Sequence, residues 1–275
     1  MAQSQTWRSN MAQLDLSRFS LAGRTAIITG GSGGIGRACA VAFAKAGANI
    51  VIASLPPESI APVVREIETL GVKGLGVSVN VADAAQVKSM VEQTLAVFGR
   101  IDVLANVAGG SYSRNPHMPA FNRAPLLDLA PEDFMTAYEV NTKSAFLCAK
   151  AVVPAMKAQG KGSIINIGSI SGRSTKKERA DMAAYGTAKA AVMNLTFHMA
   201  NQWGPEVRVN AIAPGIIDTP RPAGTGREQS FAESAKNIAL GRTGTADEVA
   251  GVALFLASDA ASYVNGSVID VNGGE

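Results

Sequence analysis

Short apolar runs alternate along the chain with longer segments in which apolar side chains recur every three to four positions. The runs are rich in β-branched residues and are typical of strands, whereas the periodic segments are typical of amphipathic helices. The expected strands cover residues 25–30, 49–54, 74–80, 101–109, 162–169, 207–214 and 266–273. The expected helices cover residues 34–47, 56–71, 84–99 and 131–159, the segment around Tyr185 and a shorter stretch before the last strand.

The order of these elements indicates the fold. Apolar runs without alternation are typical of strands covered on both faces, and the βαβα order implies parallel pairing with right-handed crossovers. We therefore predict an α/β protein: a single-domain Rossmann fold with a doubly wound parallel sheet of about seven strands and helices on both faces. Residues 21–275 are expected to form this domain, and residues 1–20 a flexible N-terminal arm.

Two connections are longer than packing requires. Residues 110–130 follow the fourth expected strand, and residues 218–231 follow the sixth. Both leave the carboxyl ends of their strands, where open α/β sheets bind ligands. We expect them to form the walls and lid of a pocket.

Charge and composition exclude several classes of function. The net charge is only +3 and no block of five or six basic residues occurs, so a nucleic-acid partner is not expected. The sequence shows neither a signal peptide nor a membrane-spanning run, which predicts a cytoplasmic protein. Cys39 and Cys148 match no metal or thiol motif and are expected to be buried, and no cluster of ligands predicts a metal.

Tyr185 and Lys189 lie four positions apart, on one face of an alanine-rich helix. In water the phenol and the ammonium have pKa values near ~10 and ~10.4 and are poor proton shuttles. A fixed ammonium favours the phenolate, so we expect Lys189 to make Tyr185 a better proton donor and acceptor near neutral pH.

The sequence TGGSGGIG, residues 29–36, joins the first expected strand to the first helix. Gly30, Gly34 and Gly36 permit a tight turn and close backbone approach, and the amides at the helix start can face a pyrophosphate. This context predicts a dinucleotide site.

The TGxxxGxG spacing resembles that of the short-chain dehydrogenase/reductase family, classical type, and other motifs match it in order. NVAG at 106–109 is similar to the family's NNAG, with Val107 in place of the second Asn. YGTAK is similar to its YxxxK, NIGSISG to its serine segment and PGIIDT to its nicotinamide-contacting turn. The resemblance covers about residues 21–274.

The resemblance implies hydride transfer between a nicotinamide cofactor and a carbonyl compound or secondary alcohol. Tyr185 would act as general acid and base, and Lys189 would hold the cofactor ribose and favour the phenolate. Ser169 would hydrogen-bond the substrate oxygen, and Asn141 would anchor a water of a proton relay. A non-catalytic dinucleotide-binding sensor or regulator on the same fold is the alternative, which the complete set of four residues argues against.

The resemblance also implies a cofactor site. It would comprise Gly30, Ser32, Gly34, Ile35, Gly36, Ser54, Asn80, Val81, Asn106, Ala108, Gly109, Tyr185, Lys189, Pro214, Gly215, Ile217 and Thr219. Ser54 stands where NAD enzymes usually place a carboxylate, which favours NADP. No basic residue adjoins Ser54, and Gly33 stands where NADP enzymes of the family often have a cation, so NAD stays open.

The distance between the serine and the tyrosine departs from the family. Ser169 and Tyr185 are sixteen positions apart, about three more than usual, which leaves Ser171 as the alternative catalytic serine. The segment GRSTKKER, residues 172–179, lies between the serine and the tyrosine and contains four cations: Arg173, Lys176, Lys177 and Arg179. They form either a solvated surface loop or a site for an anionic substrate group.

The remaining expectations concern partners and the two histidines. The substrate would be a small carbonyl compound or alcohol, and the resemblance implies a homo-oligomer, a tetramer or dimer. His117 is expected to be an ordinary loop residue and His198 a packing or interface residue on the tyrosine helix.

Overall fold

Seven parallel strands form the centre of the molecule, in the order β3-β2-β1-β4-β5-β6-β9. The computed structural model describes residues 15–111, 122–173, 177–219 and 227–275. The strands of the sheet are β1 (Thr25–Thr29), β2 (Asn49–Ser54), β3 (Gly74–Ser78), β4 (Val103–Asn106), β5 (Gly162–Ile167), β6 (Val207–Pro214) and β9 (Val268–Val271). The predicted doubly wound Rossmann fold is confirmed.

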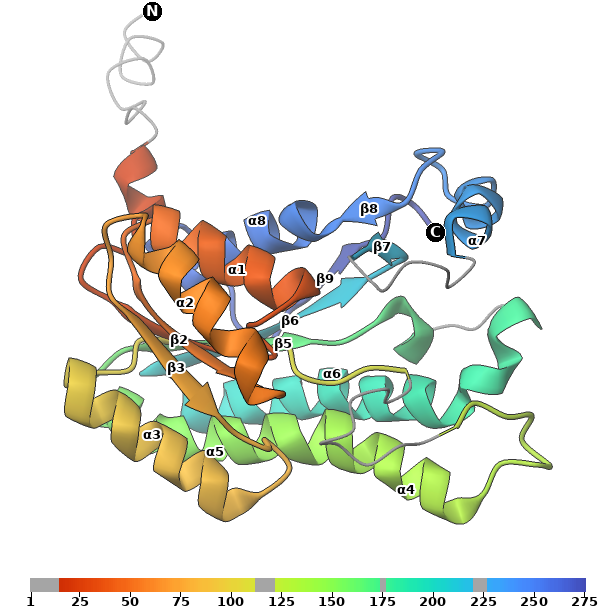
Figure 1. Ribbon diagram of the computed structural model, residues 1–275, viewed down its shortest axis with the longest axis horizontal. Helices are drawn as coiled ribbons and strands as arrows, with labels where there is room; N and C mark the ends of the chain where they lie inside the picture. The colour runs from red at the N-terminus through yellow and green to blue at the C-terminus, as the bar shows by residue number, and fades with distance from the viewer. Residues whose placement is uncertain (1–14, 112–121, 174–176, 220–226) are drawn as a thin grey trace, which may run out of the picture.

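Helices cover both faces of the sheet (Figure 1). One face carries α1 (Gly34–Lys45), α2 (Ile60–Glu68) and α8 (Ala246–Ala257). The other carries α3 (Ala84–Phe98), α4 (Pro131–Tyr138), α5 (Ser144–Ala158) and α6 (Ala183–Trp203). None of the described helices is both long enough and apolar enough to cross a lipid bilayer.

The two helical layers explain why the strands read as unbroken apolar runs. Successive side chains of a strand point to opposite faces. Ile28 and Ile52 therefore pack into the core under α1 and α8, whereas Ile27 and Val51 pack into the core on the α3 and α5 side. Successive residues in the middle of these strands are apolar, because helices bury both faces of the sheet.

The two cysteines lie inside these cores, as predicted. Cys39 on α1 and Cys148 on α5 are both buried, and neither forms a disulfide. Burial raises the pKa of each thiol to about 12, so both remain protonated and unreactive at neutral pH.

Several short elements were not predicted. They are the 3₁₀ helices η1 (Leu16–Phe19), η2 (Pro57–Ser59), η4 (Ile170–Gly172), η5 (Lys177–Met182) and η6 (Asp259–Ala261), the two-residue strands β7 (Ile217–Asp218) and β8 (Gly244–Thr245), and α7 (Arg227–Ala235). β7 pairs with β8 in a separate parallel sheet. They lie with α7 at one end of the molecule (Figure 1).

The single helix expected over 131–159 is wrong in its middle. The π-helix η3 (Glu139–Lys143) separates α4 from α5. A π turn holds one more residue than an α turn, and such turns are frequent at functional sites. Asn141 lies in this turn.

The expected N-terminal arm is described only from residue 15 onward. There η1 is attached to the domain by Arg18, whose guanidinium donates hydrogen bonds to the Asp259 carbonyl at 2.8 Å and to the Ser262 hydroxyl at 2.9 Å. Residues 1–14 lie outside the described part of the chain.

The strand order reverses between β1 and β4, because the chain builds outward from β1 in one direction and from β4 in the other. Ligands of open α/β sheets bind beside the carboxyl ends of strands at such a point. Of the two long loops that leave this edge, residues 112–121 and 220–226 are outside the described residues.

Candidate active site

The turn between β1 and α1 has the backbone that a bound dinucleotide requires. Gly30 and Gly34 adopt left-handed conformations, with φ of +64° and +49°, which other residues rarely adopt. A Cβ on Gly36 would lie 2.2 Å from the Gly30 carbonyl oxygen. Within the described chain no side chain caps α1 at Gly33, so the amides around Ile35 remain available to a phosphate.

Thr29 ties the end of β1 to the segment after β4. Its Oγ1 accepts hydrogen bonds from the amides of Val107 and Ala108 at 3.0 and 3.1 Å. A Cβ on Gly30 would lie 3.1 Å from the Ala108 backbone, so the glycine turn directly contacts this predicted cofactor segment. Thr29 was not predicted as a site residue, although its place before Gly30 at a strand end was the available signal.

The turn after β6 closes over the glycine turn. Pro214 ends β6, Gly215 donates its amide to β9 at 2.9 Å, and Ile217 is buried in β7. The Thr219 methyl group lies 3.3 Å from where a Cβ on Gly34 would stand. The segments predicted to hold the nicotinamide and the pyrophosphate are therefore neighbours.

The predicted adenosine side is polar but uncharged. The hydroxyls of Ser32 and Ser54 lie 2.7 Å apart, and Ser54 ends β2 with 6% of its surface exposed. After β3, the Asn80 side-chain oxygen accepts the Ala82 amide at 3.0 Å, and Val81 is buried. Ser54 thus presents a hydroxyl at the end of β2.

Asn106 is a buried link between elements. Its Nδ2 donates to Asn166 Oδ1 at 2.9 Å and to the Ala145 carbonyl at 3.2 Å, which joins β4 to β5 and α5. Among the described residues, its Oδ1 has no hydrogen-bond partner. These contacts fix the carboxyl end of β4, which belongs to the predicted cofactor site.

Asn141 holds the start of the loop after β4. It is 1% exposed. Its Oδ1 accepts a hydrogen bond from the Gly110 amide at 3.1 Å. Its Nδ2 donates to the Gly110 carbonyl at 3.1 Å and to the Ala137 carbonyl at 2.9 Å. A Cβ on Gly109 would lie 2.5 Å from Asn141 Oδ1. The π turn thus places Asn141 against the predicted cofactor residue Gly109.

Ser169 and Tyr185 meet across the end of β5. The Ser169 hydroxyl lies close enough to the Tyr185 oxygen to lower the pKa of the phenol, and Ser169 is 7% exposed. It also accepts the backbone amide of Ser171 at 3.1 Å. This arrangement favours Ser169 over Ser171 as the serine beside the tyrosine.

Lys189 points inward one turn after Tyr185. It is 4% exposed, and its Nζ donates to the Ile167 carbonyl at 2.7 Å. The Nζ lies 5.9 Å from the centroid of the Tyr185 ring. Burial lowers the pKa of the Lys189 ammonium to about 8, so most of its charge persists at neutral pH.

The electrostatics of Tyr185 differ from our expectation. Burial is the largest influence and raises the Tyr185 pKa, whereas the nearby Ser169 hydroxyl and the charge of Arg179 lower it. The structure therefore does not support our expectation that the pKa is lowered and that Lys189 supplies the acting cation. A cation from the basic insert opposes the cost of burying the phenolate.

Two of the four insert cations are paired with carboxylates. The Arg173 guanidinium lies 3.2 Å from the Asp270 carboxylate, and the Arg179 guanidinium pairs with the Glu275 carboxylate. Lys176 and the Lys177 side chain lie outside the described residues, as does His117; His198 is exposed on α6. The sequence analysis missed Glu275, because no local pattern connects it to an arginine 96 positions earlier.

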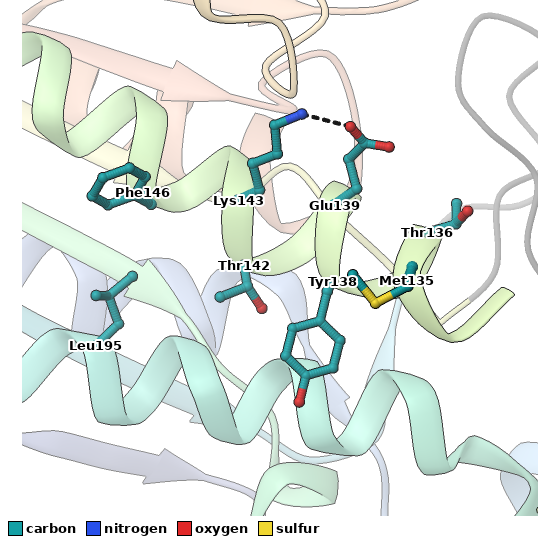
Figure 2. A pocket seen from close by; sticks show the side chains of 8 residues that line it. All are labelled: Met135, Thr136, Tyr138, Glu139, Thr142, Lys143, Phe146 and Leu195. Carbon is teal, nitrogen blue, oxygen red and sulfur yellow. Dashed lines mark hydrogen bonds and ion pairs between the residues drawn. The ribbon is translucent and has the colours of Figure 1, made fainter. Parts of the chain in front are cut away.

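A separate groove of about 580 Å³ is formed by residues of α4, η3, α5 and α6. It is lined by Met135, Thr136, Tyr138, Glu139, Thr142, Lys143, Phe146 and Leu195 (Figure 2). None of the predicted site residues lines it. Thr142 also donates to the Ala188 carbonyl at 2.9 Å, which ties the π turn to the tyrosine helix.

The residues at the carboxyl edge fit a dinucleotide. The close contacts at Gly30 and Gly36 leave backbone where side chains would intrude, and the start of α1 offers amides to phosphate. Comparison with known proteins agrees. The family model described as enoyl-(acyl carrier protein) reductase matches residues 30–275.

Individual relatives match over almost their whole length. The chain is 38% identical to 3-oxoacyl-(acyl-carrier-protein) reductase FabG of Thermotoga maritima, over 92% of this chain and 98% of that protein. It is 35% identical to cyclohexanol dehydrogenase of a Rhodococcus species, over 92% of this chain and 96% of that protein.

A solved structure is similar throughout. The solved structure of 7α-hydroxysteroid dehydrogenase complexed with NADH and 7-oxo glycochenodeoxycholic acid matches with a TM-score of 0.84 and 31% identity, over 95% of this chain and 98% of that one. From its sequence, its fold and the arrangement of its strand ends, the chain belongs to the short-chain dehydrogenase/reductase family of oxidoreductases.

Proposed function

We propose that the chain interconverts a carbonyl compound and a secondary alcohol by hydride transfer, with Tyr185 as general acid and base. The observation that carries this proposal is the proximity of the Ser169 hydroxyl to the Tyr185 oxygen, with the Lys189 ammonium one helical turn away. The glycine turn that can hold a dinucleotide opens at the same edge of the sheet.

Each side chain has a defined task in this proposal. The bound nicotinamide supplies or accepts the hydride. In reduction, the Tyr185 hydroxyl donates its proton to the substrate oxygen, and in oxidation the Tyr185 oxygen takes it back. The Ser169 hydroxyl donates a hydrogen bond to the same oxygen, where negative charge gathers in the transition state.

Lys189 and Asn141 support this chemistry. The buried Lys189 Nζ, which donates to the Ile167 carbonyl, would also hold the cofactor ribose. Asn141 fixes the backbone of the loop after β4 through both of its amide atoms. We further propose that it anchors a water of the proton relay.

The substrate class follows from chemistry shared with the relatives. Relatives include a cyclohexanol dehydrogenase and a hydroxysteroid dehydrogenase, whose names denote secondary alcohols on saturated rings. We propose a small ketone or secondary alcohol of this kind as the substrate, handled in the cytoplasm.

A panel of cyclic ketones, aldehydes and alcohols tests this function, with the reduced nicotinamide followed by absorbance for each cofactor. Tyr185→Phe should lower kcat by about 10²- to 10⁴-fold, because only the proton-transfer group is lost, while cofactor affinity measured by fluorescence titration stays close to that of the unmodified protein. Turnover undiminished by the substitution would overturn the role of Tyr185. Tight dinucleotide binding without turnover of any compound would favour a regulator.

For the cofactor we propose NADP over NAD, because Ser54 places no carboxylate where a 2′-phosphate would stand. Ser54→Asp should shift the ratio of kcat/KM toward NADH by about tenfold or more, about 1.4 kcal/mol. An unmodified chain that already favours NADH tenfold would contradict the proposal.

We also propose that the chain forms a homo-oligomer, a dimer or tetramer, through the outer side of α4, α5 and α6. This surface exposes Met135 and Phe146 at 63% and 39%, and both line the groove in Figure 2. Exposed apolar patches mark interaction sites. Phe146→Glu should therefore reduce the molar mass measured by light scattering, and an unchanged mass would argue against this surface.

A further inference from the structure

A chain of buried side-chain hydrogen bonds runs from the predicted cofactor site to the helix that carries Tyr185. Asn106 and Asn166 are register partners on β4 and β5, and the Asn106 Nδ2 donates to the Asn166 Oδ1 at 2.9 Å. The Asn166 Nδ2 donates to the Thr196 hydroxyl on α6 at 3.0 Å. That hydroxyl donates in turn to the Val192 carbonyl at 2.9 Å. We call the side chains of Asn106, Asn166 and Thr196 the polar ladder.

The polar ladder lies inside an apolar core. Its three members are 5%, 1% and 0% exposed. Leu104 and Ile164, two positions earlier on the same face of their strands, belong to that core. Buried polar groups cost free energy unless they are hydrogen-bonded, so the ladder adds little net stability over apolar side chains of the same shape. A fully bonded polar network does specify one arrangement of the elements around it.

A second polar contact joins α6 to β5. The Lys189 Nζ donates to the carbonyl of Ile167, the residue after Asn166, at 2.7 Å. Lys189 and Thr196 are seven positions apart, which is about two helical turns, so both lie on the side of α6 that faces the strand. Two contacts about 10 Å apart along the axis fix both the height and the rotation of the helix against β5.

This attachment determines how the two proposed catalytic hydroxyls meet. Ser169 follows β5, three positions after Asn166, whereas Tyr185 belongs to α6. The Ser169 hydroxyl lies close to the Tyr185 oxygen, so sliding or rotation of the helix against the strand would separate them. Thr142 also holds α6, through the Ala188 carbonyl at 2.9 Å, but it joins the helix to η3 and not to the strand that leads to Ser169.

We propose that Asn166 and Thr196 are positioning residues: their hydrogen bond sets α6 against β5 so that Tyr185 and Ser169 reach the same substrate oxygen. The inference rests on the proposed oxidoreductase function. Neither residue touches the reacting atoms, so both act through the placement of the helix. Small displacements matter here, because a shift of about 1 Å at a reacting group can lower a rate by about 10²-fold.

Thr196→Val tests this role, because valine has the shape of threonine but no hydroxyl. It should lower kcat by about tenfold or more, expressed per cofactor-binding site counted by fluorescence titration, which excludes unfolded protein as the cause. Thr196→Ser keeps the hydroxyl and should stay near the unmodified protein.

Thr94→Val is the matched control. Thr94 on α3 is 0% exposed, as Thr196 is, and its hydroxyl also donates to the carbonyl four positions earlier, at 2.8 Å. Thr94 does not belong to the polar ladder, so its substitution should leave kcat per site unchanged. Equal losses in Thr94→Val and Thr196→Val would overturn the inference.

The double variant Asn166→Leu/Thr196→Val separates position from stability. Replacing both partners by apolar groups can be nearly neutral for stability, and the Asn106 Nδ2 keeps the Ala145 carbonyl as an acceptor. We expect the urea midpoint to recover relative to Thr196→Val while kcat per site stays low. Recovery of kcat together with the midpoint would show that the ladder only stabilises the fold, and the inference would fail.

Hydrogen exchange separates this inference from the proposed function, because it requires no turnover. Thr196→Val should speed amide exchange in peptides from residues 183–203, relative to Thr94→Val. Faster exchange there, with no compound turned over, would support the attachment of α6 and refute the proposed function. If ketones are reduced but Thr196→Val matches the unmodified protein in kcat per site and in exchange, the inference fails and the proposed function stands.

Discussion

The glycine turn after β1 and the tyrosine end of α6 face the same edge of the sheet but are built by opposite means. The turn is made of backbone: Gly30, Gly34 and Gly36 leave space, and amides at the start of α1 provide the polar groups. The tyrosine end is made of buried side chains, namely Ser169, Lys189 and the ion pair of Arg179 with Glu275.

Because of this difference, the two sites should respond differently to amino-acid substitutions. The backbone site tolerates no added volume at Gly36, because a Cβ there would lie closer to the Gly30 carbonyl than a side chain permits. The side-chain site depends instead on hydrogen bonds and charge in a poorly solvated place, where the loss of one group affects its neighbours. Substitutions in the turn should therefore act on cofactor binding, and substitutions near Tyr185 on the chemical step.

The largest effect in this comparison is expected at Ser169. Ser169→Ala should lower kcat/KM by about 10²- to 10³-fold, because a hydrogen bond to the developing charge is lost. Ser171→Ala should stay near the unmodified protein, since it is the Ser171 backbone amide that bonds Ser169. Steady-state kinetics on both variants decide the matter, and the reverse ranking would assign the role to Ser171.

At the glycine turn, Gly36→Ala should weaken cofactor affinity by about tenfold or more, because its Cβ would force the Gly30 carbonyl to move. Gly33→Ala is the matched control: a Cβ there meets nothing within 4 Å, and its extended backbone suits alanine. Cofactor titration by fluorescence measures both. Equal affinities in the two variants would show that the close contact at Gly36 is not needed.

The smallest expected effect is a pH dependence at Lys189. Burial lowers its pKa from 10.5 to about 8, so between these values the unfolded chain holds a proton that the folded chain has released. The free energy of unfolding therefore rises with pH in this window. Relative to Lys189→Met, the unmodified protein should gain about 1–2 kcal/mol between pH 8 and 9.5.

Urea denaturation at a series of pH values measures this gain. Measurements stop at pH 9.5 because Tyr185, whose pKa is raised by burial, contributes with the opposite sign above that range. Lys88→Met, at a lysine whose side chain is 78% exposed, is the control and should keep the original slope. Parallel curves for the unmodified protein and Lys189→Met would contradict the burial argument.

The features that the sequence predicted are those encoded locally. Unbroken apolar runs predicted strands covered on both faces, and the sheet confirms them. The glycine spacing predicted a turn whose dihedral angles only glycine readily adopts. In both cases the physical cause lies within a few residues of the pattern, so no knowledge of distant contacts was needed.

What was missed depends on contacts between distant parts of the chain. Arg179 and Glu275 are 96 positions apart, and the balance between burial and charge at Tyr185 depends on all the groups around it. The sixteen positions between Ser169 and Tyr185 are absorbed in part by η4 and η5. Periodicity did not reveal these short turns, because a 3₁₀ segment is too brief to show a repeat.

The π turn at Glu139–Lys143 also determines how α5 faces the core. One inserted residue rotates everything downstream by about 100° around the helix axis. Cys148, Val152 and Met156, which follow the turn along α5, are buried. Shortening the turn by a residue would direct this apolar stripe away from the sheet. The same turn therefore sets both the face of α5 that packs on the sheet and the position of Asn141.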